Sequence, residues 1–506
     1  MAALIAILPL AGVVAVSASG ATADIAGPDL IRYGLTSAAL AALVAVITGV
    51  TGTVAAWLVV MYRFPGHGIL AWALALPFAM PAFAMAYAYA DLFDMAGDLR
   101  VWMRASAGFD LPIDLRSLPG AAFVLSCAFY PYVYLAMRAA FVSLPREAFE
   151  SARLLGCTAR QALMRVAVPM ARPALAAGVA LAVMETLADY GAVQFLDVQT
   201  LTTGVVRAWF VYGSLASAAL FALPLLGVSA LLLWIERRSR RGRSYDDGRG
   251  RGQCLPVTRL TGARAVAATG YCLTLVGLGL LLPTGWLVWT SLDVVPDWPR
   301  LAAAARHSLG LAVAGAVVTV ILASSLALSA QRFPIAGRMA SLGYATPGAV
   351  MAIGLLIPAG WLWSVVPGGS ANVAAGLLLL LYAYAARLMA AALQPVEAGL
   401  ARVTPSMTQA ARTLGAGPTA AALRVQLPIA APALFTAGLV VLFDVLKELP
   451  ATLILRPFNF DTLATQAYTL ATDERLAEAS TATLAIVAVG LLPLLVLCRQ
   501  IARERP

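Results

Sequence analysis

Four carboxylates lie in two long apolar stretches of the sequence. Glu185 and Asp189 form one pair, and Asp444 and Glu448 form a second pair 259 residues further along the chain. Each pair is spaced i,i+4, which predicts that both of its side chains lie on one face of a helix. Charges inside a membrane-spanning helix are costly and usually functional.

Carboxylate oxygens are ligands that a hard cation prefers. The sequence therefore predicts that the two pairs, with Tyr190, line a path for a cation. A permanent metal site is not expected, because conduction requires weak binding. The alternative is structural: Lys447 lies three residues from Asp444 and could neutralise it, and backbone amides or other helices could bind the remaining carboxylates.

The composition requires a lipid environment for most of the chain. Of its 506 residues, 61% are hydrophobic and 12% are charged, against about 25% charged in soluble domains. In lipid the backbone must satisfy its own hydrogen bonds, and the long apolar runs favour helices over a barrel. We expect an all-α integral membrane protein with about twelve transmembrane helices, near 3–19, 34–61, 69–91, 119–142, 174–195, 213–235, 266–291, 308–330, 339–363, 373–393, 432–454 and 479–498.

An internal repeat divides the chain. Between residues 152–175 and 411–434, twelve of 24 positions are identical. The sequence thus predicts a first six-span half (1–236), a basic linker (237–265) and a second six-span half (266–506). Six is an even number, so the two halves have the same orientation and form a parallel repeat.

The basic linker indicates how the chain is oriented. Nine arginines fall between residues 236 and 265, and basic loops of this kind stay in the cytoplasm. With six spans on either side, both termini are then cytoplasmic, and loops 196–212 and 456–478 lie outside. The net charge of +10 is explained by this topology rather than by binding of nucleic acid. The first apolar segment resembles a signal peptide but lacks a basic start, so we expect an uncleaved first span.

The repeated segments themselves form cytoplasmic loops, at 144–173 and 403–432. Each is predicted to hold a short helix, at 147–155 and 406–414, that ends at Gly156 or Gly415 with a positive φ. Two equivalent cytoplasmic elements imply a partner with two equivalent docking surfaces.

These loops resemble the signature loop of importer permeases of the ATP-binding-cassette type. The first copy carries the motif at Glu147, Ala148, Ala152, Leu155, Gly156, Pro169 and Pro173. The second copy keeps Ala411, Leu414, Gly415, Pro428 and Pro432 but has Ser406 and Met407 in place of the Glu-Ala pair. The resemblance implies that two copies of a cytoplasmic ATPase subunit dock on the two short helices, and that a periplasmic binding protein delivers the cargo. It also implies location in the bacterial inner membrane.

Further stretches around residues 188–209 and 447–479 resemble fused permeases that import ferric iron. The resemblance implies that the outer loops receive the binding protein, with Arg207, Asp461, Asp473, Glu474 and Arg475 as docking charges. Alternatives within the class are import of thiamine, polyamine or aminophosphonate. The alternative from another class is a secondary transporter with two six-span halves.

Catalytic motifs are not visible in the sequence. It contains no phosphate-binding loop of the Walker type, no His-Glu-x-x-His zinc motif and no nucleophile elbow. We therefore expect a permease that is not itself an enzyme and needs no cofactor, with ATP hydrolysis on a separate subunit. The five cysteines show no spacing that predicts a disulfide or metal framework, and His67 and His307 are expected to be structural.

Overall fold

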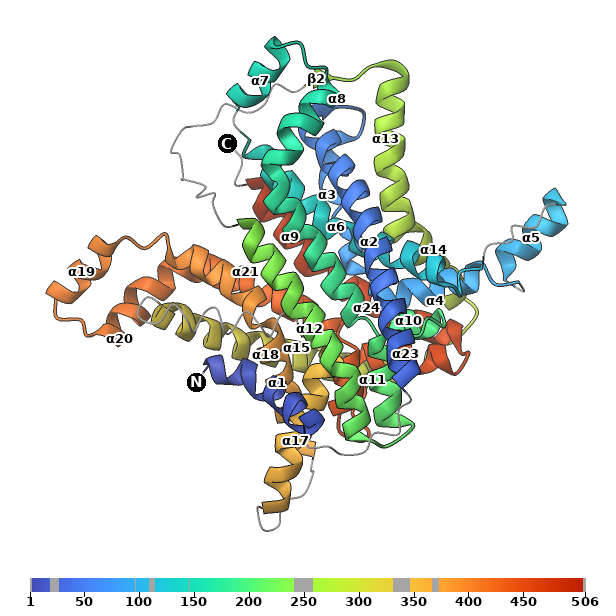
Figure 1. The fold of residues 1–506 in the computed structure, drawn as a ribbon, viewed down its shortest axis with the longest axis vertical. Coiled ribbons are helices and arrows are strands. Elements are labelled where there is room, and N and C mark those ends of the chain that lie inside the picture. Colours follow the sequence, from blue (N-terminus) through green and yellow to red (C-terminus); the bar gives the residue numbers. More distant parts are fainter. Residues whose placement is uncertain are drawn as a thin grey trace. The chain divides into compact units, whose positions relative to one another are not determined.

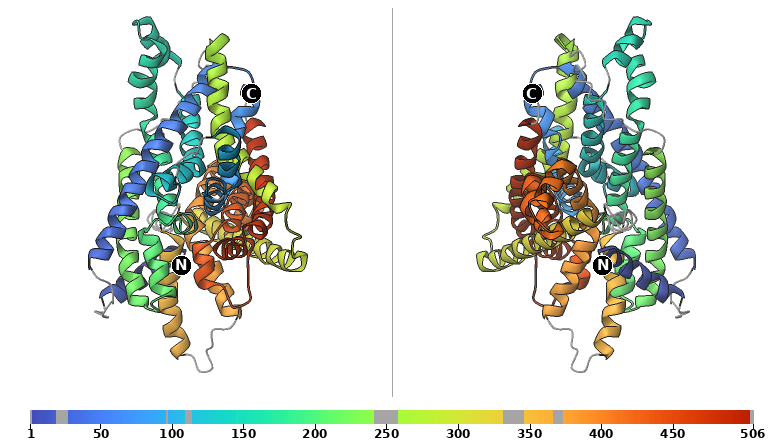
Figure 2. Two further views of the ribbon diagram at one scale, coloured as in Figure 1. Left: turned by 90° about the vertical axis from the view of Figure 1, so that its right-hand side faces the viewer. Right: turned by 90° about the vertical axis from the view of Figure 1, so that its left-hand side faces the viewer.

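The fold is given by a computed structural model, which describes residues 2–18, 27–95, 97–108, 114–144, 146–240, 258–330, 346–365 and 373–503. Most of the basic linker, Cys254 and the predicted break at 367–370 lie outside the described residues, as does the start of the ninth predicted span. The described chain is largely helical (Figures 1 and 2).

The described residues contain eight helices that are long and apolar enough to cross a bilayer, or nine if one bent pair counts as a single span. The all-α membrane class is thus confirmed, but the count of twelve spans is not. The bent pair joins His67–Ala79 to Ala82–Leu92 at 92°, where Pro77 and Pro81 interrupt the predicted third span. Two further apolar helices, Gly348–Gly360 and Leu476–Leu491, are shorter.

One compact unit comprises Ile31–Thr200 and Val228–Asp293. Within it α6 packs against α9, α4 packs against α10 and α14, and α13 packs against α3. Its elements are α2 (Gly27–Met61), β1 (Tyr62–Arg63), α3 (His67–Ala73), η1 (Leu76–Ala79), α4 (Ala82–Leu92), α5 (Asp98–Ala107), α6 (Leu118–Val142), α7 (Arg146–Leu154), α8 (Ala159–Ala162), η2 (Leu163–Ala167), α9 (Val168–Ala188), α10 (Gly191–Phe195), the end of α12 (Leu215–Arg240), β2 (Thr258–Arg259), α13 (Gly262–Val276), η3 (Gly277–Leu281) and α14 (Leu282–Ser291).

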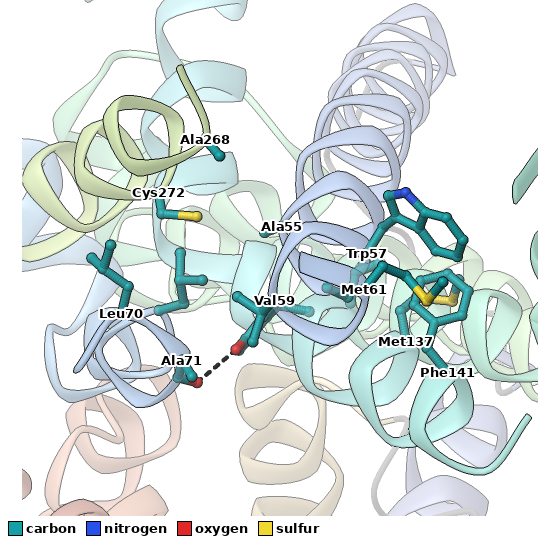
Figure 3. Close-up of a cluster of buried hydrophobic side chains, with 14 of the residues drawn as sticks. Ala55, Trp57, Val59, Met61, Leu70, Ala71, Met137, Phe141, Ala268 and Cys272 are labelled. Atoms are coloured by element: carbon teal, nitrogen blue, oxygen red, sulfur yellow. Dashed lines mark hydrogen bonds between the residues drawn. The ribbon is translucent and has the colours of Figure 1, made fainter. Parts of the chain in front are cut away.

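Helix α6 lies at the centre of this unit because two glycines allow close approach. A Cβ on Gly52 of α2 would lie 2.7 Å from the Val133 Cβ atom, and one on Gly178 of α9 would lie 2.8 Å from the Val133 Cα atom. Small residues at such crossings let helix backbones pack tightly in lipid. Beside them, the Tyr134 hydroxyl donates to the Ala71 carbonyl at 2.6 Å within a buried apolar cluster (Figure 3).

The second compact unit comprises Met1–Leu30, Leu201–Gly227 and Val294–Pro506. Within it α15, α18 and α21 pack against one another, α1 packs against α17, and α23 packs against α24. Its elements are α1 (Ala2–Ala18), α11 (Leu201–Phe210), the start of α12, α15 (Trp298–Ala330), α17 (Gly348–Val365), α18 (Val373–Leu400), α19 (Pro405–Thr413), α20 (Pro418–Ala421), η5 (Ala422–Gln426), α21 (Leu427–Leu446), α22 (Pro450–Leu455), α23 (Leu463–Thr472) and α24 (Leu476–Arg503).

The two units do not coincide with the two halves of the sequence. Helix α1, from the first half, packs against α17 of the second, and α13 and α14, from the second half, pack against α3 and α4 of the first. The strand pair β1–β2 joins the end of the linker to the α2–α3 connection in parallel register, Tyr62 with Thr258. Each half of the sequence therefore contributes helices to both units.

Proline explains three π-helical turns in the long helices. The turns η2, η3 and η5 end two residues before Pro169, Pro283 and Pro428, respectively. Proline has no N–H to donate, and its ring clashes with the carbonyl four residues earlier. A local π turn widens the helix at that point and allows it to continue. The turns η2 and η5 also lie at equivalent positions of the repeat.

Candidate functional site

The first repeated loop folds as a short helix with a tightly closed end. Helix α7 runs from Arg146 to Leu154, and Gly156 has a φ of 85°. The Cys157 N–H donates to the Ala152 carbonyl at 3.0 Å, which is the long hydrogen bond of a Schellman motif. The predicted helix and the positive φ of Gly156 are therefore confirmed.

The second repeated loop has the same local geometry. Helix α19 runs from Pro405 to Thr413, and Gly415 has a φ of 87°. The Ala416 N–H donates to the Ala411 carbonyl at 3.0 Å, and the Gly415 N–H donates to the Arg412 carbonyl at 3.0 Å. Loss of the Glu-Ala pair in this copy therefore does not alter the helix or its end.

Both copies present matching apolar side chains to solvent. Leu155 is 85% exposed and its counterpart Leu414 is 88% exposed. Met164 and Leu423, also equivalent in the repeat, are 61% and 66% exposed. An exposed apolar patch that recurs at equivalent positions indicates an interaction surface rather than chance exposure.

The two copies differ in how the short helix is attached. Ala152 of α7 is buried in the apolar cluster of its unit, and Glu147 is exposed. No residue of α19 is buried. Its attachment includes a hydrogen bond from the Gln426 side chain in η5 to the Thr408 hydroxyl, 3.3 Å long. The side chain of Ala148 is outside the described residues.

The predicted carboxylate faces are interrupted in the structure. Helix α9 ends at Ala188, and Asp189 has an extended backbone with ψ of 132°. Helix α21 ends at Leu446, two residues before Glu448. The prediction of continuous helices over 174–195 and 432–454 is therefore wrong. Helix α9 ends at the second carboxylate of its pair, whose N–H still donates to the Glu185 carbonyl at 2.9 Å, and α21 ends before the second carboxylate of its pair. A short helix follows each break, α10 or α22.

The second carboxylate of each pair binds the start of the short helix that follows it. The Asp189 Oδ1 atom accepts hydrogen bonds from the N–H groups of Ala192, at 2.8 Å, and Val193, at 3.3 Å. Glu448 accepts from the N–H groups of Ala451 at 3.1 Å and Thr452 at 3.0 Å. Carboxylates stabilise the free N–H groups and the positive end of a helix in this way.

Glu448 also lies in a buried polar network. Arg387 of α18 donates to its Oε1 atom at 3.0 Å, and the Thr452 hydroxyl donates to its Oε2 atom at 2.7 Å. The Tyr384 and Thr452 hydroxyls are 2.7 Å apart. A Cβ at Gly348 would lie 2.5 Å from the Glu448 Oε1 atom, so a larger residue there would displace the carboxylate.

The first carboxylate of each pair has a different environment. The Asp444 carboxylate is 3.0 Å from the Lys447 Nζ atom, and that Nζ atom lies 4.4 Å from the centre of the Phe443 ring. Neutralisation of Asp444 by Lys447, the alternative drawn from the sequence, is thus present. Glu185 and Tyr190 are half-buried in the other unit.

Of the residues predicted to dock a binding protein, some form ion pairs within the chain and others are exposed on its surface. Asp461 forms an ion pair with Arg456, and its carbonyl is 3.0 Å from Nδ1 of His307, which stacks on Phe460 at 4.1 Å. The structural role expected of His307 agrees with these contacts. Burial lowers the pKa of Arg456.

The remaining docking candidates lie at two places in one unit. The Nε atom of Arg475 is 2.8 Å from a carboxylate oxygen of Glu478 at the start of α24. Asp473 and Glu474 are exposed at the turn between α23 and α24, and Glu474 has a φ of 60°. Arg207 is exposed on α11, 5.8 Å from the centre of the Tyr212 ring.

Sequence reasoning missed Arg387. It is the first charge after a run of 48 uncharged residues and lies inside the predicted span 373–393, and that position alone could have marked it as a buried partner. Among the described residues, no group of three or more His, Cys, Asp or Glu side chains could hold a metal ion.

The helical fold and the two repeated loops define an integral membrane protein of the permease class. Residues 48–241 match the family described as "Binding-protein-dependent transport system inner membrane component". Three relatives extend this match. The Fe(3+)-transport system permease protein FbpB 2 of Haemophilus influenzae is 24% identical over 88% of this chain and 85% of its own length.

The other two relatives align with about half of the chain or less. The sulfate transport system permease protein CysT of Escherichia coli is 30% identical over 46% of this chain and 85% of its own length. The protein of the same name from Salmonella typhimurium is 32% identical over 38% of this chain and 71% of its own length. The chain therefore belongs to the inner-membrane permeases of binding-protein-dependent transport systems, and over 88% of its length it is similar to a ferric-iron permease.

Proposed function

We propose that the chain is the membrane-spanning subunit of an ATP-driven importer that moves ferric iron from a periplasmic binding protein into the cytoplasm. The observation that supports ferric iron as the cargo is the match to the Fe(3+)-transport permease, which extends over 88% of the chain. The sulfate permeases are similar to at most about half of it. Sulfate import is the second candidate, and it is favoured by their higher identity.

Two copies of an ATPase subunit bind the permease, one at α7 and one at α19. The support is the matching geometry of the two elements: a short helix, a glycine with positive φ, and the equivalent exposed residues Leu155 and Leu414. Both elements continue through a π turn into a long apolar helix, α9 or α21. Movement of a bound ATPase would therefore pass directly into that helix.

The two ATPase contacts are unequal in this proposal. Burial of Ala152 ties α7 to the core of its unit, whereas α19 has no buried residue. A displacement of α7 is transmitted through packed side chains, which are close to incompressible. A displacement of α19 passes through its hydrogen bond with η5 and through the chain itself. Coupling is therefore stronger through the first half.

The carboxylates have separate roles in the proposed path. Asp189 and Glu448 stabilise the short helices that follow the breaks, and Asp444 is paired with Lys447. Glu185 is the candidate for contact with the passing cation because it lies within α9, one turn before the helix ends, and Tyr190 follows that end. The interrupted helices place irregular backbone at membrane depth, which proteins tolerate where it borders a path or is covered by other helices.

The binding protein docks on the outer loops 196–212 and 456–478, with both termini of the permease in the cytoplasm. Asp473 and Glu474 are exposed and available for an intermolecular contact. Asp461 and Arg475 have ion-pair partners within the chain, so they shape these loops. Arg207 adds a positive charge on α11.

The test is ATP hydrolysis by the assembled complex in proteoliposomes. The permease is reconstituted with its ATPase, and a binding protein is added empty, loaded with ferric iron, or loaded with sulfate. Ferric iron is supported if the iron-loaded protein stimulates hydrolysis and iron-55 enters the vesicles. Stimulation by the sulfate-loaded protein alone would reject iron but keep the transporter class. Cargo movement without ATP would instead favour a secondary transporter.

A further inference from the structure

Helix α5 (Asp98–Ala107) has a position fixed by the spans around it. It begins six residues after α4 ends at Leu92, and α6 begins at Leu118. Its axis extends away from α4 instead of folding back over the other helices of its unit (Figure 1). Helix α6 is long and apolar enough to cross a bilayer, and α4 belongs to a bent apolar pair that would enter it. The polar segment between them, which contains α5, is therefore expected near one surface of the bilayer.

Two arginines fix the rotation of α5 about its axis. The Arg100 Nη1 atom donates to the carbonyl of Phe93, the residue directly after α4, at 3.5 Å. Arg104, one turn further along, donates to the Met95 carbonyl. Cations at the carboxyl end of a helix bind its free carbonyl groups and its negative dipole. The arginine face of α5 is thereby turned toward the end of α4.

The side of α5 opposite the two arginines carries Trp102, which is 64% exposed. Val101, beside the arginines, is 47% exposed, and Met95 in the turn before α5 is 68% exposed. Tryptophan is enriched at membrane–water boundaries because its ring is apolar and its N–H is polar. Amphipathic helices with arginine on one face and Trp on the other lie in the plane of that boundary.

We propose that α5 lies on the membrane surface as an amphipathic anchor, with Trp102 inserted at the boundary between the headgroups and acyl chains of anionic phospholipids. The arginines supply the charge complement to lipid phosphates: Arg104 is exposed, and the Arg116 side chain is 57% exposed and 4.0 Å from Asp94. The proposal does not depend on the cargo or on which side of the membrane α5 lies.

The anchor has a consequence for the candidate path. Helix α4 precedes α5 and packs against α10, the short helix that Asp189 stabilises. If α5 holds the end of α4 at the lipid surface, α10 packs against a helix whose position is fixed. Helix α5 is thus a support for the interrupted helix rather than a spacer between two spans.

Tryptophan fluorescence in brominated lipid tests the proposal. The full-length permease is placed in phosphatidylglycerol vesicles with or without bromine atoms on the upper part of the acyl chains. The fluorescence of Trp102 is the intensity of the wild type minus that of Trp102→Phe. We expect brominated lipid to quench more than half of this Trp102 fluorescence. The fluorescence of Trp57, obtained in the same way from Trp57→Phe, should be quenched much less, because Trp57 is 5% exposed in the core.

Two outcomes would overturn the anchor. The first is a Trp102 contribution that is equal in both lipids and quenched by iodide in the water phase. The second is iodide quenching that disappears when cargo-loaded binding protein is added, which would assign α5 to that partner. If Trp102→Phe does not fold, Trp102→Tyr provides the same difference. Arg104→Gln should weaken quenching by brominated lipid if the arginine face sets the rotation of α5.

Discussion

Asp189 and Glu448 stabilise equivalent helices from equivalent positions, 259 residues apart in the chain. Asp189 accepts a hydrogen bond from the N–H of Ala192 at 2.8 Å, and Glu448 accepts one from the N–H of Ala451 at 3.1 Å. In each half, a long apolar helix therefore stops, and a carboxylate starts a short helix after the stop. The repeat thus extends beyond the docking loops to the interrupted helices.

The Arg387–Glu448 pair gives the first prediction. Their side chains are 13% and 3% exposed, so removal of the Glu448 charge breaks a buried ion pair. Breaking a buried ion pair in this way costs about 3–5 kcal/mol. Glu448→Gln should therefore lower the apparent melting temperature of the detergent-purified protein, although glutamine can still accept bonds from the N–H groups of α22. The melting temperature is measured by loss of the monodisperse peak on size-exclusion chromatography.

A double variant separates charge from packing at this pair. Replacing both charges often has little effect on stability, so Arg387→Met with Glu448→Gln should regain most of the lost melting temperature. Asp189→Asn is the matched control at the equivalent site, where asparagine remains a good helix cap, and its effect should be smaller. A double variant as unstable as Glu448→Gln would show that the pair is not the source of the loss.

The two short helices α7 and α19 and their glycine ends could be predicted from the sequence because their determinants are local. Gly156 and Gly415 follow apolar-periodic turns, and a glycine in that position ends a helix whatever surrounds it. The sequence-based prediction of continuous helices through Asp189 and Glu448 was wrong. Periodicity alone cannot distinguish a continuous helix from one that ends and is followed by a second, capped helix. The network around Glu448 depends on Arg387, 61 residues away in the chain. A contact at that separation requires the packing of α18 against α22.

The glycines that end α7 and α19 give the second prediction. A Cβ on either residue would meet nothing within 4 Å, while their φ values are 85° and 87°. A β-branched side chain there costs roughly 1–2 kcal/mol through the backbone alone. Gly156→Val and Gly415→Val should remain in the membrane at wild-type amounts and lower transport. Asparagine tolerates this conformation, so Gly156→Asn should transport nearly normally. Full transport by both valine variants would refute the coupling role.

The exposed leucines give the third prediction. Leu155 and Leu414 are 85% and 88% exposed, and an aspartate at the centre of an apolar contact would be desolvated when the ATPase binds. Leu155→Asp and Leu414→Asp should each weaken ATPase binding by about tenfold or more, as expected for a residue that contributes strongly to an interface. Affinity is measured by titrating labelled ATPase onto the permease in nanodiscs. Ser151→Asp, on the exposed surface of α7, is the control.

Crosslinking tests whether the partner binds twice, and it forms the fourth prediction. Cysteines placed at Leu155 and Leu414 should each form a crosslink to an ATPase subunit, and the product with both should contain two ATPase copies. The physical basis is the equivalent long hydrogen bond after α7 and after α19, together with the positive φ of the glycine that follows each leucine. The weaker attachment of α19 predicts a lower yield at Leu414. Crosslinking at one site alone would contradict symmetric docking.

Glu185 gives the last prediction, which concerns the path itself. It lies within α9, one turn before the break, while Asp189 stabilises the helix after the break. The two carboxylates should therefore fail in different ways. Glu185→Gln keeps the size of the side chain and removes its charge, so it should lower iron-55 uptake by about tenfold, equivalent to about 1.4 kcal/mol, without loss of assembled complex. Asp189→Asn keeps a good helix cap, so it should lower uptake less than Glu185→Gln, and any loss should follow the amount of assembled complex. The iron-55 uptake of both variants is normalised to the amount of complex with bound ATPase.

Normal uptake by Glu185→Gln would show that Glu185 has only a packing role. Loss of assembly in Glu185→Gln would show that neighbouring helices need the charge of Glu185. The assignment of ferric iron as the cargo would then depend on the similarity to the Fe(3+)-transport permease alone.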